Sequence, residues 1–79
     1  MYHTIRFAAE FVAQPELPPR HRRQRALIRK GDLLKAQVRP YVVETRRGFA
    51  EVADLYFEDG SMTRRVPYRC FAFVDGDGS

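Results

Sequence analysis

Arginine is the residue type that dominates the chemistry this chain can perform. Twelve of its fourteen cationic side chains are arginine, and the stretch RHRRQRALIRKG at residues 20–31 carries six cations and no acid. A guanidinium group binds a carboxylate or a phosphate through two parallel hydrogen bonds. These residues therefore predict recognition of an anion, and a nucleic-acid backbone is a polymeric form of one.

The residue types needed for catalysis or metal binding are scarce. Neither His3 nor His21 has a companion at metal-ligand spacing or a carboxylate close by in the same element. The two serines stand in a turn and at the chain end, and the five glycines are scattered at turns. Neither a catalytic triad nor a phosphate-cradling loop is expected from this pattern. We therefore expect a protein that is not an enzyme and that uses no metal or cofactor.

The single cysteine and the short apolar runs indicate a compartment. Cys70 has no second cysteine to pair with, which agrees with a reducing environment. It lies in an apolar run, so we interpret it as a small core residue and not as a nucleophile. No apolar run reaches the ~18 residues needed to span a bilayer. The sequence therefore predicts a cytoplasmic protein without a membrane partner.

Positive charge is concentrated in the middle of the chain. The net charge is +4, yet residues 20–47 hold ten cations against only Asp32 and Glu44. Cations gathered this densely repel one another unless an anion or an acidic surface lies alongside. We therefore expect the anionic partner to meet this part of the chain.

Alternating apolar and polar residues predict a mainly β protein that must position these cations. We expect strands at residues 2–12, 33–44, 49–58, 61–68 and 70–74, a proline-rich loop at 14–19, and hairpin turns at 45–48 and Asp59-Gly60. Residues 21–30 fit a short helix and an extended basic loop equally well. Residues 1–74 would form one small β domain, followed by a flexible polar tail at residues 75–79.

The two hairpin turns predict how the central strands pair. The first turn places Ala36, Val38 and Pro40 opposite Phe57, Leu55 and Ala53, and on the other face Lys35, Gln37 and Arg39 opposite Glu58, Tyr56 and Asp54. The second turn places Tyr56, Asp54 and Ala53 opposite Thr63, Arg65 and Val66. Leu55 then falls opposite Arg64, and this poor match suggests a bulge. On the polar face we expect surface ion pairs of Asp54 with Arg39 and Arg65, and of Glu58 with Lys35.

Five short strands with tight hairpins predict the fold class. We expect a small, strongly bent antiparallel sheet or a five-stranded barrel. The alternative is a bent sheet covered by one short helix near residues 21–30.

The cations that the sheet leaves without partners predict a binding module. They are Arg20, Arg22, Arg23, Arg25, Arg29 and Lys30 in a basic arm, and Arg46 and Arg47 at a hairpin tip. Tyr41 and Tyr56 fall on the outer face and could stack on nucleic-acid bases. Our first hypothesis is therefore a non-enzymatic module that binds nucleic acid, which requires the arm and the tip to lie on one surface.

The alternative hypothesis is a protein-interaction or assembly module. An edge strand around Pro40, or the basic arm, would dock on a partner or on a second copy of the chain. Glu51 falls on the face otherwise assigned to the core, where it marks either the rim of the sheet or a groove.

Overall fold

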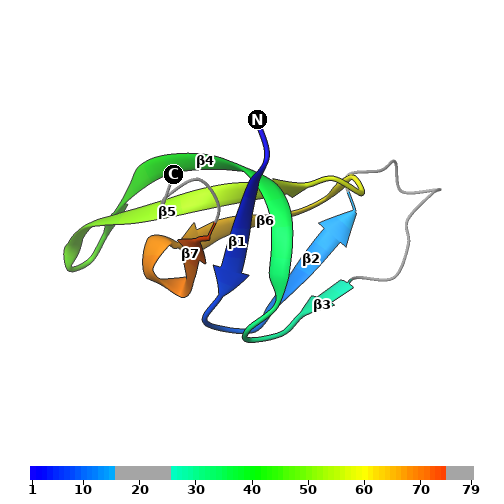
Figure 1. The fold of residues 1–79 in the computed structure, drawn as a ribbon. Helices are drawn as coiled ribbons and strands as arrows, with labels where there is room; N and C mark the ends of the chain where they lie inside the picture. Colours follow the sequence, from blue (N-terminus) through cyan, green and yellow to red (C-terminus); the bar gives the residue numbers. More distant parts are fainter. Residues whose placement is uncertain (16–25, 75–79) are drawn as a thin grey trace.

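A single curled sheet forms the protein. The computed structural model describes residues 1–15 and 26–74, and their seven antiparallel strands follow the order β3-β2-β6-β5-β4-β1-β7 (Figure 1). The strands are β1 (His3–Phe7), β2 (Phe11–Pro15), β3 (Ala26–Ile28), β4 (Leu33–Thr45), β5 (Gly48–Phe57), β6 (Ser61–Pro67) and β7 (Phe71–Phe73), with a 3-10 turn at Tyr68–Cys70. The sheet curls through 231° as a half-barrel, which confirms the predicted strongly bent antiparallel sheet.

The described residues form seven strands instead of five because the strand expected at residues 2–12 is divided and Ala26–Ile28 forms a strand of its own. The expected strand at residues 2–12 breaks between Phe7 and Phe11, so that β1 pairs with β4 and β7 while β2 pairs with β6 and β3. Because of this break, the two halves of the alternating sequence, β1 and β2, lie in different walls of the half-barrel. β2 continues through Gln14 and Pro15, two residues into the expected proline-rich loop.

Of the two alternatives for residues 21–30, the short helix is wrong for the part that the structure describes. Ala26–Ile28 forms β3, which pairs with Phe11–Ala13 of β2. Edge pairing to β2 buries Ile28, and a helical turn would have left the edge of β2 open. Residues 21–25 lie outside the described residues.

The β4–β5 hairpin has the register that the sequence predicted. Ala36 pairs with Phe57, Gln37 with Tyr56, Val38 with Leu55, Arg39 with Asp54, and Pro40 with Ala53. Thr45 pairs with Gly48 across the Arg46-Arg47 turn, and Gly48 adopts the positive φ (121°) that favours glycine. The Thr45 hydroxyl donates to the Gly48 carbonyl at 2.8 Å and fixes this turn.

The β5–β6 hairpin differs from the prediction by one residue near its turn. Tyr56 pairs with Met62 instead of Thr63, because Glu58, Asp59 and Gly60 all belong to the turn. Gly60 adopts φ +90° and donates its N–H to the Phe57 carbonyl at 3.1 Å. A bulge between Ala53 and Leu55 then restores the predicted pairing of Ala53 with Val66. The sequence therefore predicted the bulge correctly, although it predicted a turn that was one residue too short.

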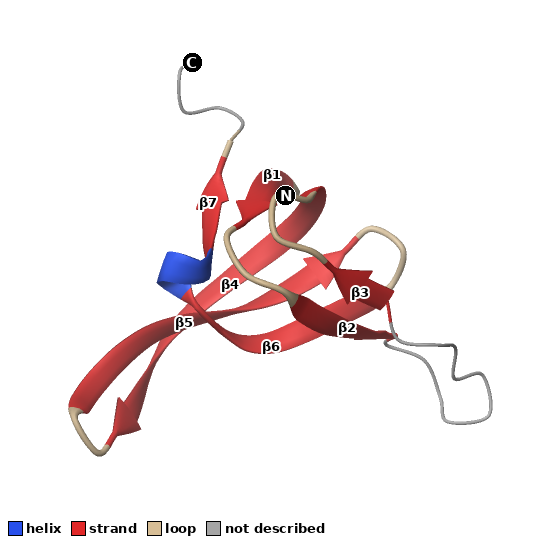
Figure 2. Cartoon of the chain, turned by 90° about the horizontal axis from the view of Figure 1, so that it is seen from below, coloured by secondary structure: helices blue, strands red, loops and turns tan. Residues whose placement is uncertain are grey.

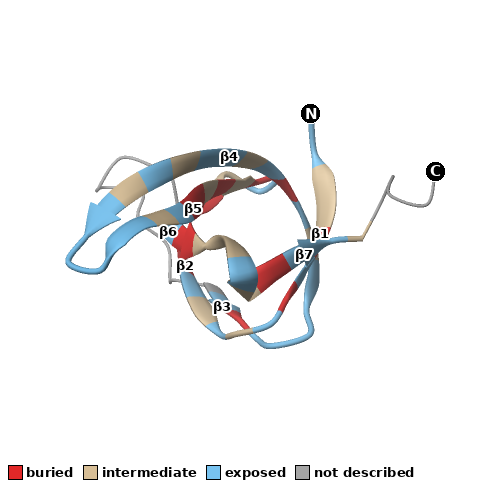
Figure 3. Cartoon of the chain, turned by 90° about the vertical axis from the view of Figure 1, so that its left-hand side faces the viewer, coloured by how far each residue is buried: buried red, intermediate tan, exposed pale blue. Residues whose placement is uncertain are grey.

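The core lies inside the curl of the sheet (Figure 3). Phe7 is 1% exposed and its ring is 5.6 Å from that of Phe11, 6.3 Å from that of Phe57 and 6.5 Å from that of Phe71. These rings come from four different strands, so they join the walls of the half-barrel. Cys70 packs against this cluster as a partly buried residue, in agreement with its predicted core role.

The far half of the β4–β5 hairpin projects from the half-barrel (Figure 2). In the described part of the chain, β1 pairs with β4 no further than Ala36, and β6 pairs with β5 no nearer the tip than Val52. Residues 42–51 therefore form a two-stranded extension, which we call the arm and which is distinct from the basic arm of residues 20–30.

Candidate nucleic-acid interface

The described cations predicted to bind nucleic acid lie in two separate places. Arg29 and Lys30 precede β4 in the β3–β4 turn, whereas Arg46 and Arg47 follow it at the tip of the arm (Figure 1). The thirteen residues of β4 separate the two pairs, and all four side chains are exposed. Arg20, Arg22, Arg23 and Arg25 lie outside the described residues. The structure therefore does not bring the hairpin tip together with Arg29 and Lys30.

A polar hollow lies instead on the outer face of β4 and β5. It has a volume of about 480 Å³ and is lined by Tyr2, Gln37, Arg39, Tyr56, Phe57, Glu58 and Gly60. Tyr56 pairs directly with Gln37, and the β1–β4 register continued by one residue places Tyr2 on the other side of Gln37. Arg39 follows two residues later on the same face of β4. The hollow thus combines two aromatic rings with a guanidinium group.

Arg39 forms no ion pair with the carboxylate that faces it. Asp54 Oδ1 accepts hydrogen bonds from the Tyr41 hydroxyl at 2.8 Å and from the Arg65 backbone N–H at 3.0 Å. Within the described residues, neither the Arg39 nor the Arg65 side chain forms an ion pair with Asp54, and Lys35 forms none with Glu58. The predicted ion pairs are therefore absent from the described residues, in line with the small gain that an exposed ion pair offers.

Tyr41 donates to Asp54 and does not line the hollow. Desolvation, and then the hydrogen bond to Asp54, raise the pKa of the Tyr41 phenol above its ordinary value of 10.0. Tyr41 therefore stays a neutral donor, and it lines a different groove beside the arm. Of the two tyrosines that the sequence singled out, only Tyr56 belongs to the hollow.

Strand β2 ends next to this hollow. β2 ends at Pro15, and Pro15 pairs with Ser61, the residue that follows Gly60 on the rim of the hollow. Arg20 comes only five residues after Pro15 in the sequence. Sequence reasoning missed both this neighbourhood and Tyr2, although Tyr2 shares the outward alternation of Thr4 and Arg6 in β1.

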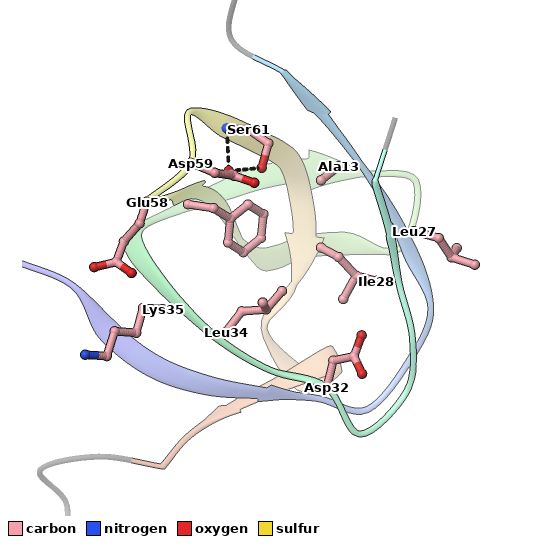
Figure 4. Close-up of a pocket in the computed structure, with 10 residues that line it drawn as sticks. Ala13, Leu27, Ile28, Asp32, Leu34, Lys35, Glu58, Asp59 and Ser61 are labelled. Carbon is pink, nitrogen blue, oxygen red and sulfur yellow. Dashed lines mark hydrogen bonds between the residues drawn. The ribbon is translucent and has the colours of Figure 1, made fainter. Parts of the chain in front are cut away.

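A second cavity opens inside the half-barrel and has a different chemistry (Figure 4). Its volume is about 280 Å³, and its wall includes the apolar residues Ala13, Ile28, Leu34 and Phe57. Three carboxylates and one cation stand around it, from Asp32, Glu58, Asp59 and Lys35. Figure 4 shows the Lys35 and Glu58 side chains turned away from the cavity. An excess of carboxylates repels phosphate, so this cavity is not part of the candidate interface.

Two of those carboxylates already have local partners. Asp32 Oδ2 accepts the Arg29 backbone N–H at 2.9 Å. Asp59 Oδ1 accepts the Ser61 hydroxyl and the Ser61 backbone N–H, and these bonds hold the pKa of Asp59 below its ordinary value of 3.8. Both carboxylates therefore stabilise the turns that carry them.

The open edge of β4 bears on the alternative hypothesis of strand addition. Beyond Ala36 this edge has no partner among residues 1–15 and 26–74. Hydrogen bonding alternates along an antiparallel strand, and counting from the Thr45–Gly48 turn places Pro40 among the residues that face the open edge. Proline has no N–H to donate there, so it disfavours addition of another strand.

Residues 1–15 and 26–74 contain no group of three or more His, Cys, Asp or Glu side chains that could hold a metal ion. That part of the chain also has no helix with the length and hydropathy to cross a bilayer.

Comparison of the chain with known protein families, with curated proteins and with solved structures finds no match. The features of the chain that bear on its function are therefore the geometry of the hollow and the charge around it.

Proposed function

We propose that this protein binds single-stranded nucleic acid on the outer face of β4 and β5. The observation that supports this function is the hollow, in which the exposed Arg39 accompanies Tyr2 and Tyr56 and forms no ion pair with Asp54. Bases stack on aromatic rings with little regard to sequence, and arginine binds the phosphates between them. Stacking on these rings requires an unpaired base, which favours a single strand.

Each group has a separate role in the proposed complex. Tyr56 and Tyr2 stack on bases, Gln37 between them hydrogen-bonds a base edge, and Arg39 binds a phosphate. Glu58 repels phosphate at the opposite rim and so orients the strand toward Arg39. The basic residues 20–25 follow the chain segment anchored at Pro15 and supply further phosphate contacts, which makes the affinity strongly dependent on salt.

Fluorescence anisotropy with labelled single-stranded RNA and DNA of random sequence tests this function. We expect binding at ~50 mM salt that weakens steeply by ~200 mM, as counterion release requires. Tyr56→Leu keeps an apolar side chain but removes the ring, and it should weaken binding by about 5- to 150-fold. Circular dichroism would show that the variant is folded.

A matched pair of arginine variants separates a site from general charge. Arg39→Ala should weaken binding and lower the slope of log affinity against log salt by about one. Arg69→Ala removes the same charge from the 3-10 turn, where Arg69 is exposed, and should leave both quantities nearly unchanged. Absence of binding at ~50 mM salt, where phosphate contacts are strong, would overturn the proposal. Equal losses in the two variants would also overturn it.

A further inference from the structure

The arm exposes two large apolar side chains to solvent, where they do not contribute to the stability of the monomer. Phe49 is 77% exposed and Val42 is 58% exposed. They lie on the same face of the arm. Val42 pairs with Glu51 and Glu44 pairs with Phe49, and these two pairs are two residues apart, so their side chains point to the same side of the sheet. Contiguous exposed apolar surface with a polar rim is typical of an interaction site.

Charge changes sign along this face of the arm. Glu51 lies near the base, where it lines a groove of about 340 Å³ with Pro40, Tyr41, Val42 and Tyr68. The basic residues Arg46 and Arg47 lie at the tip, two positions beyond the Glu44–Phe49 pair, and Glu51 lies two positions on the other side of it. The tip and the base are therefore equally spaced from the Glu44–Phe49 pair and carry opposite charge. This leaves Glu51 at a groove, one of the two alternatives that its sequence position allowed.

We propose that this face of the arm is the interface between two copies of the chain. The two arms pack face to face and antiparallel about a twofold axis that passes beside Phe49. Phe49 then contacts the Phe49 of the second copy, and the Arg46-Arg47 tip of each copy reaches the Glu51 groove of the other. Apart from Glu44, which lies opposite Phe49 and so close to the axis, such a surface is complementary to itself, as a twofold interface must be. The aliphatic stems of the arginines cover Val42.

The second copy fits this surface because the arm supplies both halves of each contact. The dimer does not depend on nucleic-acid binding, because Gln37, Arg39 and Tyr56 lie on the opposite face of the β4–β5 hairpin. Loss of the dimer and loss of nucleic-acid binding are therefore separable results.

Sedimentation velocity over a dilution series tests the interface. We expect a reversible dimer for the unchanged chain and a monomer for Phe49→Ser. Leu33→Ser is the matched control, because Leu33 is 53% exposed at the opposite end of β4 and should leave the dimer unchanged. A monomer at every concentration of the unchanged chain overturns the proposal, and so does a dimer that survives Phe49→Ser.

A charge exchange tests the pairing of tip and groove. Glu51→Arg and the double variant R46E/R47E each place like charges at both contacts, so each alone should lose at least about tenfold in dimer affinity. An equimolar mixture of the two variants restores opposite charges at both contacts of the mixed dimer. We expect the mixture to dimerise within about threefold of the unchanged chain. Two folded variants that remain monomeric when mixed would show that the tip does not meet the groove.

Discussion

Substitution of Arg65 by glycine should stabilise the protein. Arg65 has φ +54°, and among the described residues other than glycine it alone has a positive φ. This region costs an L-amino acid roughly 1–2 kcal/mol and costs glycine almost nothing. Glycine loses about 0.5–1 kcal/mol through the greater freedom of the unfolded chain. The free energy of unfolding should therefore rise by about 0.5–1 kcal/mol, or roughly 2–8 °C in Tm.

The neighbouring residue gives the control of opposite sign. Arg64 is also an exposed arginine in β6, but its φ is not positive. Arg64→Gly should therefore lower the free energy of unfolding by about 0.5–1 kcal/mol, as glycine does within a strand. Urea unfolding followed by circular dichroism measures both changes. If Arg65→Gly destabilises the protein as much as Arg64→Gly, the left-handed bulge at Arg65 is not formed in solution.

Further substitutions test the core, the turns and the open edge. Leu55 is fully buried, so Leu55→Ala should cost about 2–5 kcal/mol by chemical denaturation, and a loss below ~1 kcal/mol would contradict its place in the core. The pKa of Asp59 is lowered in the folded state, so its stabilising contribution is present above the ordinary value of 3.8 and is lost as the pH falls through the folded pKa. Asp59→Asn should therefore flatten the decline of Tm below pH ~4, and an unchanged decline would exclude this role. Asp54→Ala should lower Tm more than Asp54→Asn, because the asparagine oxygen still accepts from Tyr41 and Arg65. Pro40→Thr restores an N–H at the open edge and should increase self-association in light scattering.

The pairing of the β4–β5 hairpin could be predicted from the sequence because it depends on neighbouring residues. A two-residue alternation over Leu34 to Val38 and a glycine at position 48 are local, and a shift by one residue would turn the apolar side chains outward. The bulge in β6 could be expected for the same reason. Its exact register could not, because the length of the Glu58–Gly60 turn depends on backbone conformation.

The composition of the hollow was decided by the tertiary structure. Tyr2 and Tyr56 are far apart in sequence and meet only because β1 and β5 flank β4 on opposite sides. The separation of the hairpin tip from Arg29 and Lys30 also depends on the path of β4. That path cannot be derived from the distribution of charge along the sequence. Tertiary pairing likewise divided the strand expected at residues 2–12, since no local signal favours a break there over a continuous strand.

The sequence by itself determined that this protein is mainly β, how β4 pairs with β5, and that its positive charge gathers in residues 20–47. Only the tertiary structure decided which charges are free to bind. Asp54 faces Arg39 in the predicted register, yet its oxygen accepts from Tyr41 and from the backbone of Arg65. The reason is physical: hydrogen bonds within the sheet hold the half-buried Asp54, whereas an ion pair with the exposed Arg39 would gain little in water. That choice leaves Arg39 available beside Tyr56, and the proposed function depends on it.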